Sequence, residues 1–133
     1  MPTFCLPIRV YYEDTDAGGV VYHTNYLKFM ERARTEWLRH LGFEQLQLKE
    51  KYNLLFVVRS LSINYHKPAF FDDQLRVVAE LGEKITKVSL VFLQKIYRDD
   101  LLLCSAEVSI VSVNAQTFRP KPIPDVVLQI LKT

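Results

Sequence analysis

The chain has 133 residues, of which 49% are hydrophobic and 24% are charged, and its formal net charge is +2. This composition is typical of a folded globular protein and excludes a disordered chain. The weak net charge, without a basic stripe, argues against a nucleic-acid-binding protein, although a mildly basic surface can attract an anionic small molecule. A chain of this length can bury one core, so we expect a single domain over residues 1–133.

Cysteine usage and apolar runs indicate the compartment. Cys5 and Cys104 lie far apart and without a CxxC spacing, which favours free structural thiols over a disulfide framework. The first ten residues lack the pattern of a signal peptide, and no apolar run approaches the length of a membrane span. We therefore expect a cytoplasmic protein without a membrane span.

The first elements along the chain are a strand and a long helix. Residues 6–12 (LPIRVYY) are rich in β-branched and aromatic residues, which predicts a strand. From Asn25 to Phe43, apolar residues recur at helical spacing, which predicts an amphipathic helix that ends at Gly42. The apolar positions are Tyr26, Phe29, Met30, Ala33, Trp37 and Leu41.

The rest of the chain reads as a succession of strands. Residues 54–69 alternate between two faces, and the segments 73–84, 87–98 and 101–114 have similar texture. Short turns separate the later segments, which favours an antiparallel meander, and residues 124–132 predict a short final helix. One helix against such a sheet predicts an α+β fold with the sheet curled around the helix.

The segment DTDAGGVVYHTNY, residues 14–26, places polar groups just before the long helix. Gly18 and Gly19 favour a tight turn there. Backbone N–H groups at a helix start lack internal partners and lie at the positive end of the helix dipole. An amide near His23 could therefore stabilise a developing oxyanion, with Asp16 folding back beside it or reaching it from a neighbouring subunit. These groups suffice to hydrolyse an activated acyl group. Asp14 is interpreted as a structural turn residue.

Residues 11–39 resemble a known family of enzymes. The run Thr15-Asp16-Ala17-Gly18-Gly19-Val20-Val21-Tyr22-His23-Thr24-Asn25-Tyr26 is similar, without a gap, to the motif of hotdog-fold acyl-CoA thioesterases of the 4-hydroxybenzoyl-CoA thioesterase type. Within that family it most resembles the YbgC branch, which is associated with the Tol–Pal gene cluster. The resemblance implies a hotdog fold, in which a curled antiparallel sheet of about five strands wraps a long central helix.

The resemblance also implies roles for individual residues. Asp16 takes the position of the catalytic carboxylate, and Tyr22 and His23 lie where the central helix begins. The backbone amide of His23 matches the one that polarises the thioester carbonyl, and its side chain is also available. The resemblance places further residues in contact with the substrate: Gly19, Val20 and Asn25 in the motif, and Glu31 toward the distal end of the acyl group. The alternative for Glu31 is an ion pair with Arg34.

Coenzyme A enters as part of the substrate, so no separate cofactor is expected. Its phosphates need cations, and comparison with the family points to Lys84, Lys87, Arg119 and Lys121. An acyl carrier protein could replace coenzyme A as the acyl donor. The family's domains pair so that their sheets continue across a dimer, which implies a homodimer or a homotetramer with sites between subunits. Asp16 would act either as a general base on water or as a nucleophile that forms a mixed anhydride.

Two other function classes remain open on the sequence. A hotdog hydratase or dehydratase pairs an acid with a histidine, but the hydratase branch spaces them five residues apart, whereas Asp16 and His23 are seven apart. The other class is a non-catalytic module that binds acyl-CoA or a carrier protein. A metal site is not expected, because a single Asp–His pair offers too few ligands. No dinucleotide or phosphate-loop fingerprint is present.

Overall fold

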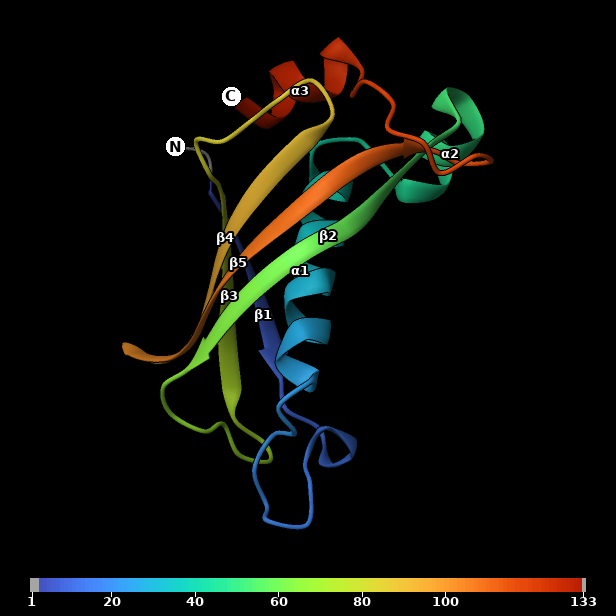
Figure 1. The fold of residues 1–133 in the computed structure, drawn as a ribbon. Coiled ribbons are helices and arrows are strands. Elements are labelled where there is room, and N and C mark those ends of the chain that lie inside the picture. The colour runs from blue at the N-terminus through green and yellow to red at the C-terminus, as the bar shows by residue number, and fades with distance from the viewer. Residues whose placement is uncertain (1–2, 133) are drawn as a thin grey trace.

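The computed structural model describes residues 3–132. Within that range the chain forms one five-stranded sheet with helices against one of its faces (Figure 1). In chain order the elements are β1 (Thr3–Arg9), the 3-10 helix η1 (Tyr12–Asp14), α1 (Asn25–His40), α2 (Gln45–Tyr52), β2 (Leu54–Tyr65), β3 (Gln74–Leu81), β4 (Ser89–Arg98), β5 (Leu101–Asn114) and α3 (Asp125–Lys132).

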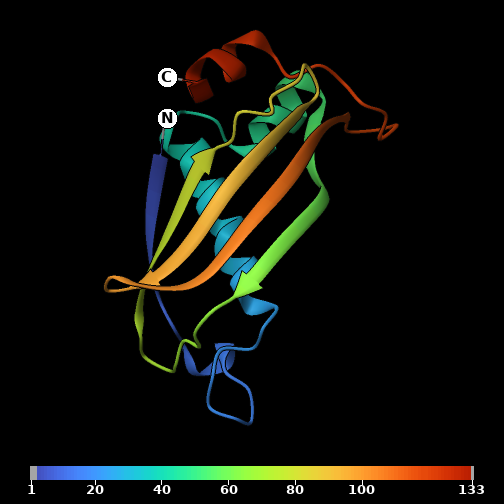
Figure 2. The same cartoon turned by 60° about the vertical axis from the view of Figure 1, so that its left-hand side comes forward.

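The sheet is antiparallel throughout, with the strand order β1-β3-β4-β5-β2. It curls around α1, as the α+β expectation has it (Figure 2). The expected meander is correct for β3, β4 and β5 but wrong for β2, which pairs with β5 and not with β3. The connection 66–73 carries the chain from β2, at one edge of the sheet, past β5 and β4 to β3, so adjacency in sequence does not decide the pairing here.

Helix α1 fills the concave side of the sheet because one of its faces is apolar. Five of the six residues predicted for that face are buried, namely Tyr26, Phe29, Met30, Ala33 and Trp37. The sixth, Leu41, is half-buried and follows the last helical residue, His40. Gly42 follows the helix with φ +95°, a left-handed conformation that glycine adopts without steric cost, so the predicted end of the helix is confirmed.

Other boundaries differ from expectation. The first strand ends at Arg9, because residues 12–14 turn into η1. Helix α2 was not predicted; its apolar residues follow no clear helical stripe, and only Leu48 is buried. The final helix begins at Asp125, directly after Pro124, as predicted.

Two features bear on the class of protein. No helix within residues 3–132 is both long and apolar enough to cross a membrane. Cys5 and Cys104 are free thiols, one exposed and the other buried, as expected from their spacing.

Candidate active site

The motif loop folds as a hairpin below the start of α1 (Figure 1). Thr15 and Val21 form an antiparallel bridge, and the Asp16 N–H donates to the Val20 carbonyl at 2.9 Å. The Gly19 N–H closes the turn on the Asp16 carbonyl at 3.0 Å, with Gly19 at φ +80°. Glycine is favoured there because side chains disfavour positive φ. The hairpin therefore has a tip at residues 16–19 and a stem that leads directly into the helix.

The stem is fixed by the carboxylate of Asp14, a residue that is only 4% exposed. One oxygen accepts the Tyr11 N–H at 2.8 Å, and the other accepts the side-chain amide of Asn25 at 2.9 Å. The Asp14 carbonyl also accepts the Tyr22 N–H at 2.9 Å. Asp14 is thus structural, as interpreted from the sequence. Asn25 is buried and engaged with Asp14, so a direct substrate contact for Asn25 stays a prediction.

Asp16 lies on the hairpin tip and is exposed. Its carboxylate accepts the Gly18 N–H at 2.8 Å, and no other partner of this carboxylate occurs within residues 3–132. A Cβ at position 18 would lie 3.2 Å from the same carboxylate oxygen, so the glycine leaves room for it. The pairing with Val20 holds Asp16 at the same end of α1 as His23. One protomer alone leaves the carboxylate open to solvent.

His23 presents an unpaired backbone donor at the start of α1. Its N–H has no acceptor in the part of the chain that the structure describes, and Thr24 provides no side-chain cap. The His23 carbonyl accepts the Tyr65 hydroxyl at 2.7 Å, and the Tyr22 ring stacks at a tilt 4.5 Å from the imidazole. A fixed donor at a helix N-terminus is suited to a developing oxyanion. Tyr22 is exposed beside it.

Two cavities lie along α1. An open one of about 330 Å³ is lined by Val21, His23, Tyr65 and Lys67 among others. A second, of about 360 Å³, lies farther along the helix, and Glu31 is on its wall. This position is compatible with the distal-acyl role predicted for Glu31, which remains a prediction.

The expected ion pair between Glu31 and Arg34 does not form. Arg34 turns inward and donates to the side-chain oxygen of Gln94 at 2.8 Å. Gln94 is in turn held by its amide on the Met30 carbonyl at 3.0 Å. Burial lowers the pKa of Arg34, and the charge of Glu31 opposes that shift.

The groups behind the hairpin stem are neutral. Burial raises the pKa of the Cys104 thiol to about 12, so this cysteine is no thiolate nucleophile near neutral pH. Burial also raises the pKa of the Tyr26 and Tyr65 phenols. No cluster of three or more His, Cys, Asp or Glu side chains suited to a metal ion occurs among residues 3–132.

The four predicted phosphate-binding cations lie at the other end of α1. Lys84 and Lys87 belong to the β3–β4 connection, and the Lys87 carbonyl accepts the Ile123 N–H at 2.8 Å. Arg119 and Lys121 follow β5, and the Lys121 ammonium donates to the Tyr52 carbonyl. Because α1 has 16 residues, its ends are about 24 Å apart. One chain therefore brings Asp16, Tyr22 and His23 together, but not these cations.

Sequence reasoning missed Tyr65, whose hydroxyl fixes the peptide after His23. The alternation of residues 54–69 could have indicated it, since Tyr65 shares a strand face with Ile63 and Leu61. It also missed Ala69, whose backbone contacts Val21 in the hairpin stem and the Tyr26 hydroxyl in the first turn of α1. A small residue in a loop carries no signal of that kind.

Comparison with known proteins places this geometry in a family. Residues 10–131 match the model of the thioesterase-like superfamily. The acyl-CoA thioesterase YbgC of Haemophilus influenzae is 47% identical over 121 residues, which cover 91% of this chain and 88% of that protein.

Solved structures agree with the sequence match. A probable thioesterase from Bartonella henselae superposes with a TM-score of 0.88 at 34% identity, over 92% of this chain and 100% of that one. The DHNA-CoA thioesterase from Staphylococcus aureus gives a TM-score of 0.84 at 28% identity, over 92% and 81% of the two chains. The chain therefore belongs to the thioesterase-like superfamily and has its hotdog fold.

Proposed function

We propose that the protein hydrolyses acyl-CoA thioesters, with the His23 N–H holding the thioester carbonyl oxygen and Asp16 activating the attack. In the general-base route, Asp16 takes a proton from water while the water oxygen bonds to the carbonyl carbon. The C–S bond then breaks, and the proton passes to the departing sulfur, which leaves as the coenzyme A thiol. The reaction consumes only water besides the thioester, so it requires no cofactor.

The observation that carries this proposal is the His23 N–H at the leading end of α1, which has no acceptor among residues 3–132 and lies beside a hairpin whose tip carries Asp16. A donor aimed at the position of the oxyanion contributes most when it is fixed before the reaction. Tyr65 fixes the His23 carbonyl, and Asp14 fixes both the Tyr22 amide and the Asn25 side chain. The donor and the carboxylate are thus held by separate contacts at one end of the helix.

The test is thiol release from a panel of acyl-CoAs with aliphatic and aromatic acyl groups, measured for the native protein and Asp16→Asn. We expect release by the native protein and a loss of about 10²- to 10⁴-fold in kcat for the variant. Undiminished release by Asp16→Asn would overturn the role of Asp16. Binding without release from any thioester would favour a binding module, and addition of water to an enoyl-CoA in the panel would favour a hydratase. Acyl carrier protein thioesters in the same panel identify the acyl donor.

The two routes for Asp16 differ in the fate of the water oxygen when water attacks the Asp16 carboxyl carbon of the anhydride. A single turnover in ¹⁸O-labelled water places label in the product acid alone if Asp16 acts only as a general base. Label in the Asp16 carboxylate would exclude that route and indicate a mixed anhydride between Asp16 and the acyl group. Mass spectrometry of the peptide that contains Asp16 measures this label.

We further propose that two copies pair through their β2 strands, and that the site is completed in this way. β2 is an edge strand of 12 residues, and it exposes Val58, Leu61 and Tyr65. A long apolar edge is a template for pairing with another strand. Both a homodimer and a homotetramer built from such dimers would pair the β2 edges, and analytical ultracentrifugation distinguishes the two assemblies.

Pairing of this kind would also explain the distant cations. Two identical strands paired antiparallel about a two-fold axis set the end near Tyr65 in one copy beside the end near Leu54 in the other. The end near Leu54 is the end of Lys87, Arg119 and Lys121, since Leu54 pairs with Asn114, whose N–H donates to the Arg119 carbonyl at 2.8 Å. In the dimer, cations of one copy would therefore bind the coenzyme A whose thioester reacts at Asp16 of the other.

Subunit mixing tests this arrangement. One inactive variant is Asp16→Asn, and the other is the combination of Lys84→Met, Lys87→Met and Arg119→Met, whose side chains have no partner within residues 3–132. Co-assembly should restore activity to one of the two sites, because that site combines an intact Asp16 with intact cations. No recovery would show that each site uses the cations of its own chain.

We propose that the reaction takes place in the cytoplasm.

A further inference from the structure

The connection 66–73 lies against both parts of the proposed site. The Ala69 carbonyl accepts the Val21 N–H at 2.9 Å, and the Ala69 N–H donates to the Tyr26 hydroxyl at 3.0 Å. Val20 and Phe70 form a further antiparallel bridge. Ala69 is fully buried between the hairpin stem and the first turn of α1. The Ala69 backbone therefore joins the stem of the Asp16 hairpin to the first turn of α1, beside the contacts that Asp14 makes with Tyr22 and Asn25.

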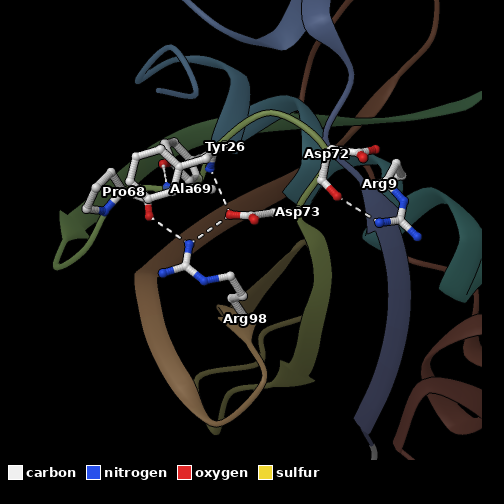
Figure 3. Close-up of polar contacts among 8 residues, drawn as sticks. Arg9, Tyr26, Pro68, Ala69, Asp72, Asp73 and Arg98 are labelled. Carbon is white, nitrogen blue, oxygen red and sulfur yellow. Dashed lines mark hydrogen bonds and ion pairs between the residues drawn. The ribbon is translucent and has the colours of Figure 1, made fainter. Parts of the chain in front are cut away.

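Arg98, at the end of β4, fastens this connection (Figure 3). One of its terminal nitrogens donates to the Pro68 carbonyl at 3.0 Å and to the Asp73 carboxylate at 2.8 Å. The same carboxylate oxygen of Asp73 accepts the Phe70 N–H at 2.8 Å, and the guanidinium lies 5.6 Å from the Phe70 ring centroid. Arg98 thus holds both ends of the segment 68–73, with Ala69 inside it.

The ion pair between Arg98 and Asp73 is partly shielded from solvent, so it can stabilise the connection. The two side chains are 26% and 20% exposed, whereas the surface pair Arg39–Glu36 is 52% and 39% exposed. Screening by water and salt weakens exposed pairs more than partly buried ones. The connection is also held from β1, because Arg9 donates to the Asp72 carbonyl at 2.7 Å (Figure 3). Arg98 links the same connection to β4.

We propose that Arg98, together with Asp73, is a positioning residue for the thioesterase site. It contacts neither Asp16 nor His23; it acts through Ala69, which sets the hairpin against the N–H of the helix start. This inference rests on the proposed function. A small misplacement of reacting groups by a remote change can cost up to about 100-fold in rate.

Kinetics of matched arginine variants test the proposal. Arg98→Met should lower kcat about 10-fold or more and leave KM within about 3-fold, because the substrate contacts remain while the reacting groups shift. Arg98→Lys keeps the charge opposite Asp73 and should recover most of the rate. The control is Arg76→Met. Like Arg98, Arg76 donates to a backbone carbonyl, that of Asp99 at 3.0 Å, and its guanidinium lies over an aromatic ring, that of Tyr97. These contacts hold the turn between β4 and β5 and not the connection 66–73. Its kcat should stay within about 2-fold of the native value.

Two further readouts separate positioning from general stabilisation. Hydrogen exchange of the Val21 and Tyr22 amides should rise at least tenfold in Arg98→Met, with no rise in the amides shared by β3 and β4. Combined with Asp16→Asn, Arg98→Met should cause no further loss of rate, since its effect passes through Asp16. Asp73→Asn serves as a second probe if Arg98→Met does not fold.

Equal losses of kcat in Arg98→Met and Arg76→Met, or a loss that adds fully to that of Asp16→Asn, would overturn the proposal. Unchanged exchange at Val21 and Tyr22 would overturn it as well. If the native protein releases no thiol from any acyl-CoA, the proposed function fails instead. The exchange rates would then still decide whether Arg98 fastens the connection.

Discussion

Two carboxylates that are two residues apart in the sequence have opposite environments in this molecule. Asp14, in the hairpin stem, is buried, and each of its oxygens accepts a structural hydrogen bond. Asp16, at the tip, is exposed and accepts a hydrogen bond only from its own turn within the described chain. The stem carboxylate accepts hydrogen bonds that hold the hairpin to the helix start, whereas the tip carboxylate is left open for the role proposed above. A rigid support beneath an uncommitted acid is the arrangement that preorganised catalysis requires.

The largest expected effect is a loss of activity without a loss of stability. Asp16→Asn should leave the free energy of unfolding within about 0.5 kcal/mol of the native value, because the side chain is exposed and the amide oxygen can still accept the Gly18 N–H. The same variant should lose most of its kcat, as set out above. Asp100→Asn, an exposed residue of the β4–β5 turn, is the control for an unspecific effect of charge. Urea unfolding beside the rate assay measures both quantities, and a large stability loss in Asp16→Asn would erase the contrast.

The stem should respond in the reverse way. Asp14→Ala removes two acceptors and leaves the Tyr11 N–H and the Asn25 amide without partners, so we expect a loss of about 3 kcal/mol in unfolding free energy. Its activity should fall as well, since the start of α1 loses its support. Thermal and urea unfolding check the stability. A native-like stability for Asp14→Ala would mean that the stem does not depend on this carboxylate.

Cys104, in the core behind the stem, should make the free energy of unfolding depend on pH. Burial raises the pKa of Cys104 from 9.0 to about 12, so the folded protein holds the thiol proton more tightly than the unfolded chain. The resulting stability is fully present below pH 9 and is lost as pH rises toward 12. By pH 11 we expect a loss of about 2–3 kcal/mol from this group, with Tyr26 adding to it in the same direction.

Cysteine variants isolate that contribution. Cys104→Ala should show a smaller fall of unfolding free energy between pH 9 and 11 than the native protein, whatever its stability at pH 7. The exposed Cys5→Ala should keep the native slope. The same slope in Cys104→Ala as in the native protein would show that this thiol does not resist ionisation.

The smallest expected effects separate the two glycines of the tip. Gly19→Ala forces a side chain into φ +80° and should cost about 1 kcal/mol of stability. Gly18→Ala should cost less, because the atom it meets is the end of the Asp16 side chain, but it displaces that carboxylate and should lower kcat a few-fold. Reversed effects, with stability lost in Gly18→Ala and rate unchanged, would contradict the geometry of the tip.

The sequence predicted the parts of the molecule that local patterns determine. The apolar stripe from Tyr26 to Trp37 required a helix, and the glycines of the motif required a tight turn before it. The partner of β2 could not be predicted, because strand pairing depends on how the connection 66–73 crosses the sheet. Helix α2 was missed because its residues form no apolar face.

For the site, the motif predicted Asp16 and His23, which the fold brings to one end of α1. It could not reveal that Lys84, Lys87, Arg119 and Lys121 lie at the opposite end, because their positions depend on the path of β4 and β5. Nor could it reveal the contacts of Tyr65, Ala69 and Arg98, which come from the end of β2, the connection that follows it and the end of β4.

The most direct test of the account is a crystal structure of Asp16→Asn with an uncleaved acyl-CoA. We expect the thioester carbonyl oxygen within about 3 Å of the His23 nitrogen, in line with a hydrogen bond. The side chain at position 16 should face the carbonyl carbon or a water held against it. A thioester bound with its carbonyl away from the start of α1, in both its own copy and the paired one, would contradict the account.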